Sequence, residues 1–427
     1  MAVESIGAKA STRVAKCDFF KLDWQRELSD MPQPILIVGN PPWVTNSTLG
    51  TINSKNVPQK SNFQNHRGID AITGKANFDI AEWMLLQLMG CLDGRQGTLA
   101  MLCKTATARK VLKYCWNNAY RISEAAIYLI DAKKHFGAAV DACLLTASFS
   151  KGSGPSECQI RTGFSDSTPS STFGLRDGRL IANLASHDRW RHLFSSSNLK
   201  WRSGVKHDCS PVMELRCENG GFHNGLGEVV DIEDRCLFPM YKSTEISKEN
   251  LRAPSRWMVL PQRNVSEDTS ALKEVAPRTW KYLTDHGALL DRRGSSIYSN
   301  RARFSIFGVG DYTFSESKVV VSALHKQPRF SAIGTSHGKP IVVDDTCYFL
   351  PCDSRAQAEA ITDLLNAPVA TDALSSFVFR DSKRPITADV LNQLNLSAIA
   401  KEAGWSDKAI SSLRPRQRGQ PQTSLFT

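Results

Sequence analysis

The sequence lacks several features that would assign it to other classes of protein. It has no run of about 18 apolar residues, so we expect no helical membrane span. The segment Met1–Gly7 has no basic stretch followed by an apolar block, so we expect no secretory signal there. The eleven cysteines form no CxxC pair. We therefore expect reduced, mostly buried thiols in a cytoplasmic protein, with neither disulfides nor a metal site.

What the chain does have is length and positive charge. Its 427 residues, of which 41% are hydrophobic, are enough for two or three domains. Lys and Arg number 53 against 42 Asp and Glu, which gives a formal net charge of +11. This excess favours a polyanionic partner such as nucleic acid, although charge alone does not establish one, because many proteins are basic for other reasons.

The first 150 residues alternate between predicted strands and helices. Strands are expected at 35–38, 97–103, 125–130 and 142–147, and helices at 79–89 and 107–118. The apolar, β-branched run at 35–38 is typical of a strand that is buried on both faces. Only residues 131–141 separate the last two strands, too few for a helical crossover, so these strands should be antiparallel neighbours. Together these elements predict an open α/β sheet.

The composition changes at Ser150. Residues 150–172 are rich in Ser, Gly, Thr and Pro, which predicts a linker or exposed loops. Beyond them, short strand-like runs such as 303–307, 318–322 and 341–343 alternate with turn signals, and one amphipathic helix is expected at 355–365. The tail after Ser412 is polar and basic, and we expect it to be disordered.

The most specific signal is Asn40-Pro41-Pro42-Trp43, at the carboxyl end of the first predicted strand. Ligands of open α/β sheets bind at this edge. Two consecutive prolines fix φ and favour extended geometry before them, so the side-chain carbonyl of Asn40 and the main-chain carbonyl of Pro41 can face one point. Two convergent acceptors without a nearby charge suit an amino group, and Trp43 offers a flat face on which a base can stack.

Such acceptors would also make an aromatic amine more reactive. The lone pair of an exocyclic amine is delocalised into its ring, so the nitrogen is a poor nucleophile. Holding both hydrogens draws the nitrogen towards tetrahedral geometry and stabilises the positive charge that develops during alkyl transfer. The alternative, for an isolated motif of this kind, is a loop in which the asparagine caps a turn and the tryptophan packs in the core.

The motif resembles motif IV, (D/N)PP(Y/F/W), of the DNA adenine-N6 methyltransferases. Cys17-Asp18-Phe19-Phe20 is similar to motif III of that family, Asn77-Phe78-Asp79 to motif V, and His135-Phe136-Gly137 with residues 141–145 to motif VIII. The resemblance implies that Asn40, Pro41, Pro42 and Trp43 are catalytic, and that Asp18 and Phe19 meet the cofactor S-adenosyl-L-methionine. It also implies that Trp43 and Phe136 stack on the two faces of an adenine extruded from the duplex, since a base inside the helix is unreachable.

The same resemblance implies a class I, Rossmann-like methyltransferase sheet, but one that is N-terminally incomplete. The glycine-rich motif I that holds the cofactor in the family does not precede Asp18. In the family's sheet the first strand lies beside the strand that ends at Asn40, so that strand is expected to have an unpaired edge here. We therefore expect methylation to require a first βαβ unit, which a separate chain could supply.

The distal half is similar to the target-recognition domains of large type II and type I-like adenine methyltransferases. Between residues 278 and 303, six basic side chains oppose only Asp285 and Asp291 and alternate with aromatic residues, which suits contacts to phosphates and bases. The alternative is a solvated charged face. The expected DNA contacts are Arg278, Lys281, Arg292, Arg293, Arg301 and Arg303. A second basic group, expected to grip the DNA backbone, comprises Lys200, Arg202, Lys206 and His207.

The sequence thus predicts a site-specific DNA adenine-N6 methyltransferase of a restriction-modification system, with double-stranded DNA as its partner and no metal. The predicted division is a partial catalytic domain at 1–150, a connecting segment at 151–235, a mixed α+β target-recognition domain at 236–400 and a tail at 401–427. Two alternatives remain open: a methyltransferase that acts on RNA or a protein amide, and a DNA-recognition subunit without catalysis.

Overall fold

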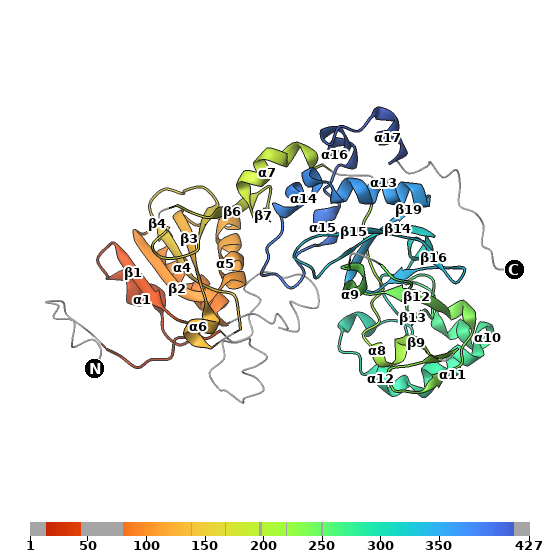
Figure 1. Ribbon diagram of the computed structural model, residues 1–427. Helices are drawn as coiled ribbons and strands as arrows, with labels where there is room; N and C mark the ends of the chain where they lie inside the picture. Colours follow the sequence, from red (N-terminus) through yellow and green to blue (C-terminus); the bar gives the residue numbers. More distant parts are fainter. Residues whose placement is uncertain are drawn as a thin grey trace. The chain divides into compact units, whose positions relative to one another are not determined.

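The computed structural model describes residues 14–43, 80–137, 139–166, 168–195, 199–218, 220–248 and 251–413. The chain divides into two compact units, Met1–Leu180 and Ile181–Thr427, which Figure 1 colours from red to yellow and from green to blue. Within the described ranges, no helix is both long enough and apolar enough to span a bilayer.

The first unit is built on a seven-stranded sheet with the order β1-β2-β4-β3-β5-β6-β7. The strands are β1 (Ile35–Gly39), β2 (Gly97–Lys104), β3 (Ile122–Ile130), β4 (Ala142–Phe149), β5 (Glu157–Arg161), β6 (Ser171–Arg176) and β7 (Arg179–Ile181). The helices that accompany them are α1 (Trp24–Ser29), α4 (Ile80–Leu92), α5 (Thr105–Asn117) and α6 (Ala132–Phe136).

The predicted strands and helices of this unit are confirmed, as is the antiparallel pair. β1 runs parallel to β2, with Ile35 opposite Gly97, whereas β4 is inserted antiparallel between β2 and β3. Helix α4 buries Leu85, Leu88 and Met89 completely or nearly so, which follows from its apolar spacing. The result is an open sheet in which β1 and β2 both end at the edge that carries the Asn40 loop.

Three sequence-based expectations for this unit are wrong. The predicted linker at 150–172 contains β5 and the start of β6, because β5 pairs parallel with β3 and buries Cys158 completely. Motif III of the family lies at the end of a strand, but the described residues 14–18 form no strand before Asp18. β1 is not buried on both faces: Leu36 and Val38, which lie on the same face, are 67% and 69% exposed, because no described residue covers that face of the strand.

The second unit contains three further sheets. A six-stranded sheet has the order β11-β10-β9-β13-β12-β18, a four-stranded sheet the order β15-β14-β19-β8, and β16 and β17 form a hairpin. The strands are β8 (Arg202–Ser203), β9 (Glu214–Glu218), β10 (Gly221–His223), β11 (Val229–Val230), β12 (Leu237–Tyr241), β13 (Arg256–Val259), β14 (Ser317–Ser322), β15 (Phe330–Ile333), β16 (Thr335–Ser336), β17 (Lys339–Pro340), β18 (Val342–Val343) and β19 (Cys347–Cys352).

The helices of this unit pack on several hydrophobic clusters, of which the two largest include residues of the six-stranded sheet and of the four-stranded sheet. They are α7 (Leu184–Trp190), α8 (Ser210–Met213), α9 (Ser243–Ile246), α10 (Leu272–Val275), α11 (Pro277–Asp285), α12 (Gly287–Asp291), α13 (Arg355–Asn366), α14 (Pro368–Ser375), α15 (Ala388–Leu391), α16 (Leu396–Glu402) and α17 (Asp407–Ser412), with single 3₁₀ turns at Arg191–Leu193, Asp234–Cys236, Thr269–Ala271, Ser296–Tyr298 and Asp311–Phe314.

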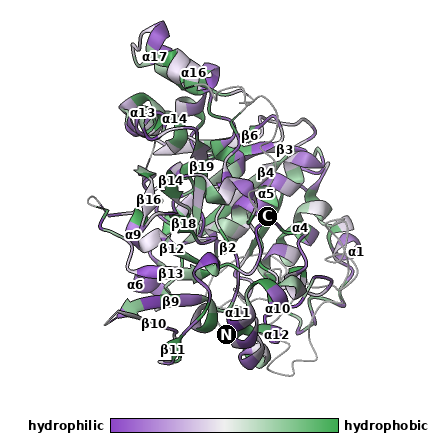
Figure 2. Ribbon diagram, turned by 90° about the vertical axis from the view of Figure 1, so that its right-hand side faces the viewer, coloured by the Kyte–Doolittle hydropathy of each residue, from purple (hydrophilic) through white to green (hydrophobic). Residues whose placement is uncertain are grey.

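The amphipathic helix predicted at 355–365 is confirmed as α13, which carries both hydrophobic and hydrophilic residues in Figure 2. Its apolar face, with Ile361 and Leu364 fully buried, packs on β14 and β15. The strand expected at 303–307 does not form. Phe304 adopts a left-handed φ of 72°, which an extended strand cannot contain, and its ring is buried in the core.

A buried ionic network ties the six-stranded sheet together. Glu214 on β9 lies 2.7 Å from Lys242 and 3.4 Å from His207, and Lys242 lies 3.5 Å from Asp344. Burial raises the pKa of Glu214, but hydrogen bonds from His207 and Lys242 outweigh it and lower the pKa to about 2. The carboxylate therefore stays charged and holds β9 to the residues that follow β12 and β18.

Replacing Glu214 should make the stability of the protein less dependent on acid pH. Because the pKa of Glu214 lies below its ordinary value, its contribution is present above about pH 4.5 and is lost as the pH falls towards 2. The fall in Tm between roughly pH 6 and pH 3 should therefore be smaller for Glu214→Gln than for the unsubstituted protein. Glu218→Gln, at the exposed end of the same strand, is the control, and identical pH profiles for the two variants would contradict this account.

Candidate functional site

The Asn40-Pro41-Pro42-Trp43 loop continues directly from β1. Asn40 and Pro42 are exposed, Pro41 is buried and Trp43 is half-buried. The preceding Gly39 pairs with Met101 so closely that a Cβ on Gly39 would lie 2.8 Å from the Met101 sulfur. Glycine thus lets β1 approach β2 at the point where the loop begins. Asn40 and Pro42 are therefore accessible at the end of the strand, whereas Pro41 and part of Trp43 are covered.

Trp43 is fixed by two contacts from other parts of the first unit. Its indole Nε1 donates to the main-chain oxygen of Leu102 on β2 at 3.3 Å. Its ring meets Phe136 edge to face, with the centroids 5.8 Å apart and the planes at 80°. The structure thus brings together the two aromatic residues that the sequence singled out. Since the rings touch each other at a steep angle, no base fits between them in this arrangement.

Phe136 lies at the end of the short helix α6. The Asp131 side chain caps this helix by accepting from the Lys134 amide at 3.0 Å, and Gly137 ends it with a left-handed φ of 66°. Phe136 itself is 50% exposed. The ring is therefore presented by a small, exposed element outside the core of the sheet.

Two polar side chains at this edge have no hydrogen-bond partner among the described residues. None of the described residues hydrogen-bonds the side chain of Asn40. The hydroxyl of Thr105, at the start of α5 immediately after β2, is buried and also has no hydrogen-bond partner in the described part of the chain. Sequence reasoning missed Thr105. Its position directly after a strand parallel to β1 is the signal that could have identified it, because the carboxyl ends of parallel strands share an edge.

The residues expected to meet the cofactor lie in a turn before α1. The Asp18 side chain accepts from the Phe20 amide at 3.0 Å and lies 3.9 Å from Lys21. Phe19 packs against Trp24, with the ring centroids 4.6 Å apart. The motif V residues 77–79 lie outside the described residues, so the structure does not bear on them.

Half of the predicted DNA-contacting cations are paired within the second unit. Arg278 lies 2.6 Å from Asp231, and the carboxylate of Glu233 accepts from its main-chain amide at 2.9 Å. Two further ion pairs join Lys281 to Asp285 at 2.6 Å and Arg303 to Asp291 at 2.8 Å. Burial raises the pKa of Glu233, but hydrogen bonds from Thr279 and the Arg278 amide outweigh it and lower the pKa to about 2.

The other three predicted cations differ from one another. Arg293 is half-buried and donates to the carbonyl oxygens of Leu290 and Ser305, both at 2.7 Å, while its guanidinium lies 3.8 Å from the Tyr298 ring centroid. Its neighbour Arg292 is exposed, and so is Arg301. Neither Arg292 nor Arg301 has a carboxylate within ion-pair distance among the residues that the structure describes.

Most residues of the second predicted basic group contact other side chains of the protein. Lys206 pairs with Asp208 at 2.5 Å, and His207 is buried against Glu214. The guanidinium of Arg202 lies over the Tyr312 ring, 4.4 Å from its centroid. Within this group Lys200 remains exposed.

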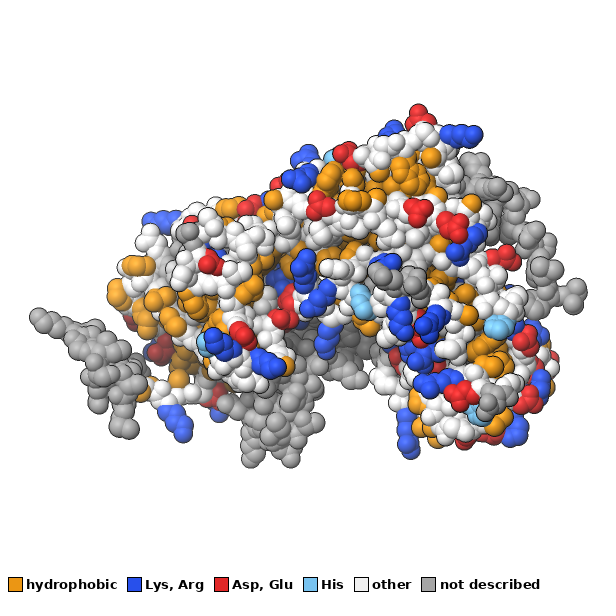
Figure 3. Space-filling view, in the orientation of Figure 1, with side chains coloured by type: hydrophobic (Ala, Val, Ile, Leu, Met, Phe, Trp, Pro, Cys, Tyr) orange, Lys and Arg blue, Asp and Glu red, His pale blue; other side chains and the backbone are white. Residues whose placement is uncertain are grey.

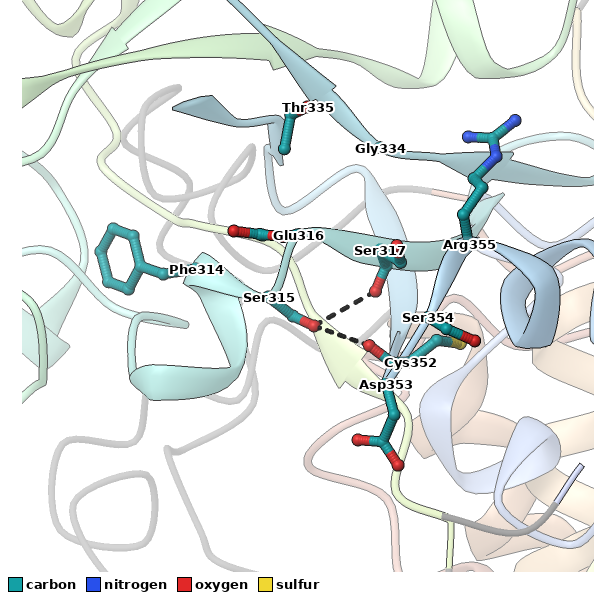
Figure 4. A pocket seen from close by; sticks show the side chains of 10 residues that line it. All are labelled: Phe314, Ser315, Glu316, Ser317, Gly334, Thr335, Cys352, Asp353, Ser354 and Arg355. Carbon is teal, nitrogen blue, oxygen red and sulfur yellow. Dashed lines mark hydrogen bonds between the residues drawn. The ribbon is translucent and has the colours of Figure 1, made fainter. Parts of the chain in front are cut away.

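A polar hollow of about 710 Å³ lies in the second unit between β14, β19 and the start of α13 (Figure 4). Ser315 lines this hollow, and its hydroxyl donates to the main-chain oxygens of Ser317 and Cys352 at 3.2 and 3.1 Å. Glu316 and Asp353 line it as well, so it does not suit an anion. Within the described ranges, no group of three or more His, Cys, Asp or Glu side chains is arranged to hold a metal ion.

Comparisons with known proteins show the family of the chain and a solved structure of similar fold. No protein-family model matches the chain. The chain is 45% identical over 385 residues to the type II methyltransferase M.NspV of Nostoc sp., which covers 90% of this chain and 80% of that protein. Its fold is similar to that of the type IIL restriction-modification enzyme MmeI, solved in complex with DNA, with a TM-score of 0.52 and 11% identity. That likeness covers 92% of this chain and 54% of MmeI, so the chain spans about half the length of that enzyme.

The contrast between Arg293 and Arg292 gives a direct test of which cation is structural. Arg293→Ala should leave buried carbonyl oxygens without donors and lower the free energy of unfolding by about 1–3 kcal/mol. Arg292→Ala removes the same charge from an exposed position and should change stability by less than about 0.5 kcal/mol. Urea denaturation of both variants distinguishes them, and equal losses would contradict a structural role for Arg293.

Proposed function

Because the chain belongs to the type II DNA methyltransferases of restriction-modification systems, we propose that it methylates the N6 amino group of adenine in duplex DNA. The observation that carries this proposal is the accessible Asn40-Pro41-Pro42-Trp43 loop at the carboxyl end of β1. Family membership also favours DNA over the RNA and protein-amide substrates left open by the sequence.

In the proposed reaction the Asn40 side-chain oxygen and the Pro41 main-chain oxygen accept the two hydrogens of the amino group. The exposure of Asn40 and the absence of a hydrogen-bond partner for its side chain among the described residues support this role. As the nitrogen attacks the methyl group it becomes positively charged, and two fixed carbonyl dipoles stabilise that charge without reorganising.

We propose that the extruded adenine stacks on Trp43 after Phe136 has moved away from the indole edge. The contact between the two rings now occupies the space beside Trp43. Trp43 is held by the hydrogen bond to Leu102, whereas Phe136 is half-exposed on a five-residue helix. Phe136 is therefore the ring that moves, and in its new position it covers the second face of the base. This stacking repays part of the cost of extrusion.

S-adenosyl-L-methionine supplies the methyl group in DNA methyltransferases. Asp18 and Phe19 are the proposed contacts to it, but the Asp18 carboxylate is bound within its own turn and Phe19 packs on Trp24. On their own these two residues do not form a site for the cofactor. We therefore expect the chain by itself to bind the cofactor weakly or not at all.

For DNA binding we propose that Arg292 and Arg301 contact phosphates, because both are exposed and neither is ion-paired among the described residues. Arg278, Lys281 and Arg303 remain candidates, but each would have to exchange a carboxylate of the protein for a phosphate. We propose that Arg293 has a structural role and stabilises the part of the fold that carries this surface.

Asn40→Ala should lower methyl transfer to duplex DNA by about 100-fold or more, because it removes one of two acceptors that act in the transition state. DNA binding should stay within several-fold of that of the unsubstituted protein. The measurement is incorporation of tritiated methyl groups by an assembly that is active before substitution.

Asn118→Ala is the matched control, since Asn118 caps the far end of α5 and its exposed side chain donates to the Tyr114 carbonyl within that helix. It should retain full activity. Full methylation by Asn40→Ala would contradict the proposal that this loop binds the amino group of the target base.

We further propose that β1 pairs with a strand outside the described residues, as part of a unit that completes the sheet and that a separate chain could supply. The support is the exposure of Leu36 and Val38, since an apolar strand with a bare edge and face is costly in water. Cofactor binding would then require that unit.

Val38→Lys should therefore abolish methyl transfer and cofactor binding by the active assembly while leaving the Tm of the isolated chain unchanged, because the side chain already faces solvent in this chain. Val229→Lys, at an equally exposed position on β11 of the second unit, is the control. Unchanged activity of Val38→Lys would contradict the proposed strand pairing, and titration calorimetry with the cofactor provides the second readout.

A further inference from the structure

A second hollow, of about 610 Å³, lies in the second unit and is lined by basic side chains. Lys326 and Arg329 line it from the loop between β14 and β15, and Arg380 lines it from the segment after α14. His325, Gln327 and Ser247 add polar groups to the lining. No Asp or Glu is among the described residues that line it. The hollow therefore presents three cations and several hydrogen-bond donors without a carboxylate.

The loop that carries Lys326 is held firmly at both ends. At its start the Ala323 amide donates to the Thr346 carbonyl at 2.9 Å, and the Leu324 amide donates to the Ser322 hydroxyl at 3.1 Å. At its end the Phe330 amide donates to the Asn366 side chain at 3.0 Å, and that side chain donates back to the Phe330 carbonyl at 2.9 Å. The basic residues are thus presented from a pinned connection, which lowers the entropy lost when a ligand binds.

Arg380 comes from a segment that is anchored beside this loop. Phe377 and Val378 are 7% and 8% exposed, and Arg384 donates to the Asp345 carbonyl at 2.6 Å. In Figure 1 the blue segment after α14 and the teal loop between β14 and β15 lie side by side, which the shared hollow confirms. Figure 3 shows Lys and Arg side chains gathered over this part of the face.

Two of the three cations that line this hollow, Lys326 and Arg380, differ in their pairing from the cations of the surface that the sequence favoured. Lys326 and Arg380 are exposed, and neither has a carboxylate within ion-pair distance in the described part of the chain. By contrast, Arg278, Lys281 and Arg303 are each paired with an Asp. An uncompensated cation gains more from a phosphate, because it gives up only water and counterions.

We propose that this basic hollow, formed by Lys326, Arg329 and Arg380, binds phosphate groups of the DNA backbone. The proposal rests on the proposed function, whose substrate it places on a stated surface. The contacts are independent of sequence, because they engage phosphates and not base edges, and they position the duplex for the parts of the protein that read it.

The test is the salt dependence of duplex binding by the full chain. Fluorescence anisotropy of a labelled duplex gives the affinity of the unsubstituted protein, Lys326→Ala, Arg380→Ala and the double variant at several salt concentrations. Each lost phosphate contact should lower the slope of log affinity against log salt by about 0.9, so the double variant should lose about 1.8. The weakening should be equal on duplexes of unrelated sequence.

Two controls separate a contact from a general effect of charge. Lys401→Ala removes one positive charge from an exposed position on α16, away from the lining of the hollow, and should leave the slope unchanged. Lys326→Arg keeps the charge and should retain the slope of the unsubstituted protein. All of these side chains are exposed, so the Tm should not change.

The two proposals fail in different ways. If the unsubstituted protein binds and, in its active assembly, methylates duplex DNA, but the double variant shows the slope of Lys401→Ala, the basic hollow is not a phosphate site and the proposed function stands. If the unsubstituted protein does not bind duplex DNA, both proposals are overturned.

Discussion

The hydrogen bond from the Trp43 indole to the Leu102 carbonyl is the contact on which the site depends. It ties the end of the Asn40 loop to β2, after Gly39 has allowed β1 to approach Met101 closely. Asn40 is thus held at the edge of the sheet by three features: the parallel pairing of β1 with β2, the close approach that Gly39 allows, and the hydrogen bond from the Trp43 indole. A loop in which Trp43 lacked this anchor would leave the carbonyl acceptors free to rotate, and fixed acceptors are what an electrostatic mechanism requires.

Local patterns predicted the first unit well because its elements follow from spacing alone. The short connection at 131–141 forced β3 and β4 to be antiparallel, and periodic apolar residues marked α4, α5 and α13. The pairing of β5 with β3 escaped prediction, since Cys158 and a few other buried side chains lie in a stretch whose overall composition is that of a loop. For Phe304, the left-handed backbone is set by tertiary packing, which no window of sequence reports.

The candidate site was likewise predictable only in part: its local motif could be predicted, whereas ion pairs between residues distant in the sequence could not. The loop itself and the meeting of Trp43 with Phe136 were predictable, because the motif residues carried them, and membership of the DNA methyltransferases is confirmed; the choice of adenine stays a prediction. The DNA surface was less predictable. Counting charges between 278 and 303 overlooked Asp231 and Glu233, which lie more than forty positions away and neutralise Arg278 in the fold. Electrostatics depends on distance in space, so a sequence count overestimates how many cations are available.

The five-residue length of α6 also has a consequence for how the protein can evolve. Because α6 is a single capped turn on the surface, its opening is independent of the unfolding of the sheet, whose strands are bound by long ladders. Substitutions that make the core more robust would therefore leave the lifetime of the closed aromatic pair unaltered. In the proposed reaction, where Phe136 moves aside for the base, thermal tolerance and the opening of this pair thus depend on separate parts of the first unit, and selection can adjust one without changing the other.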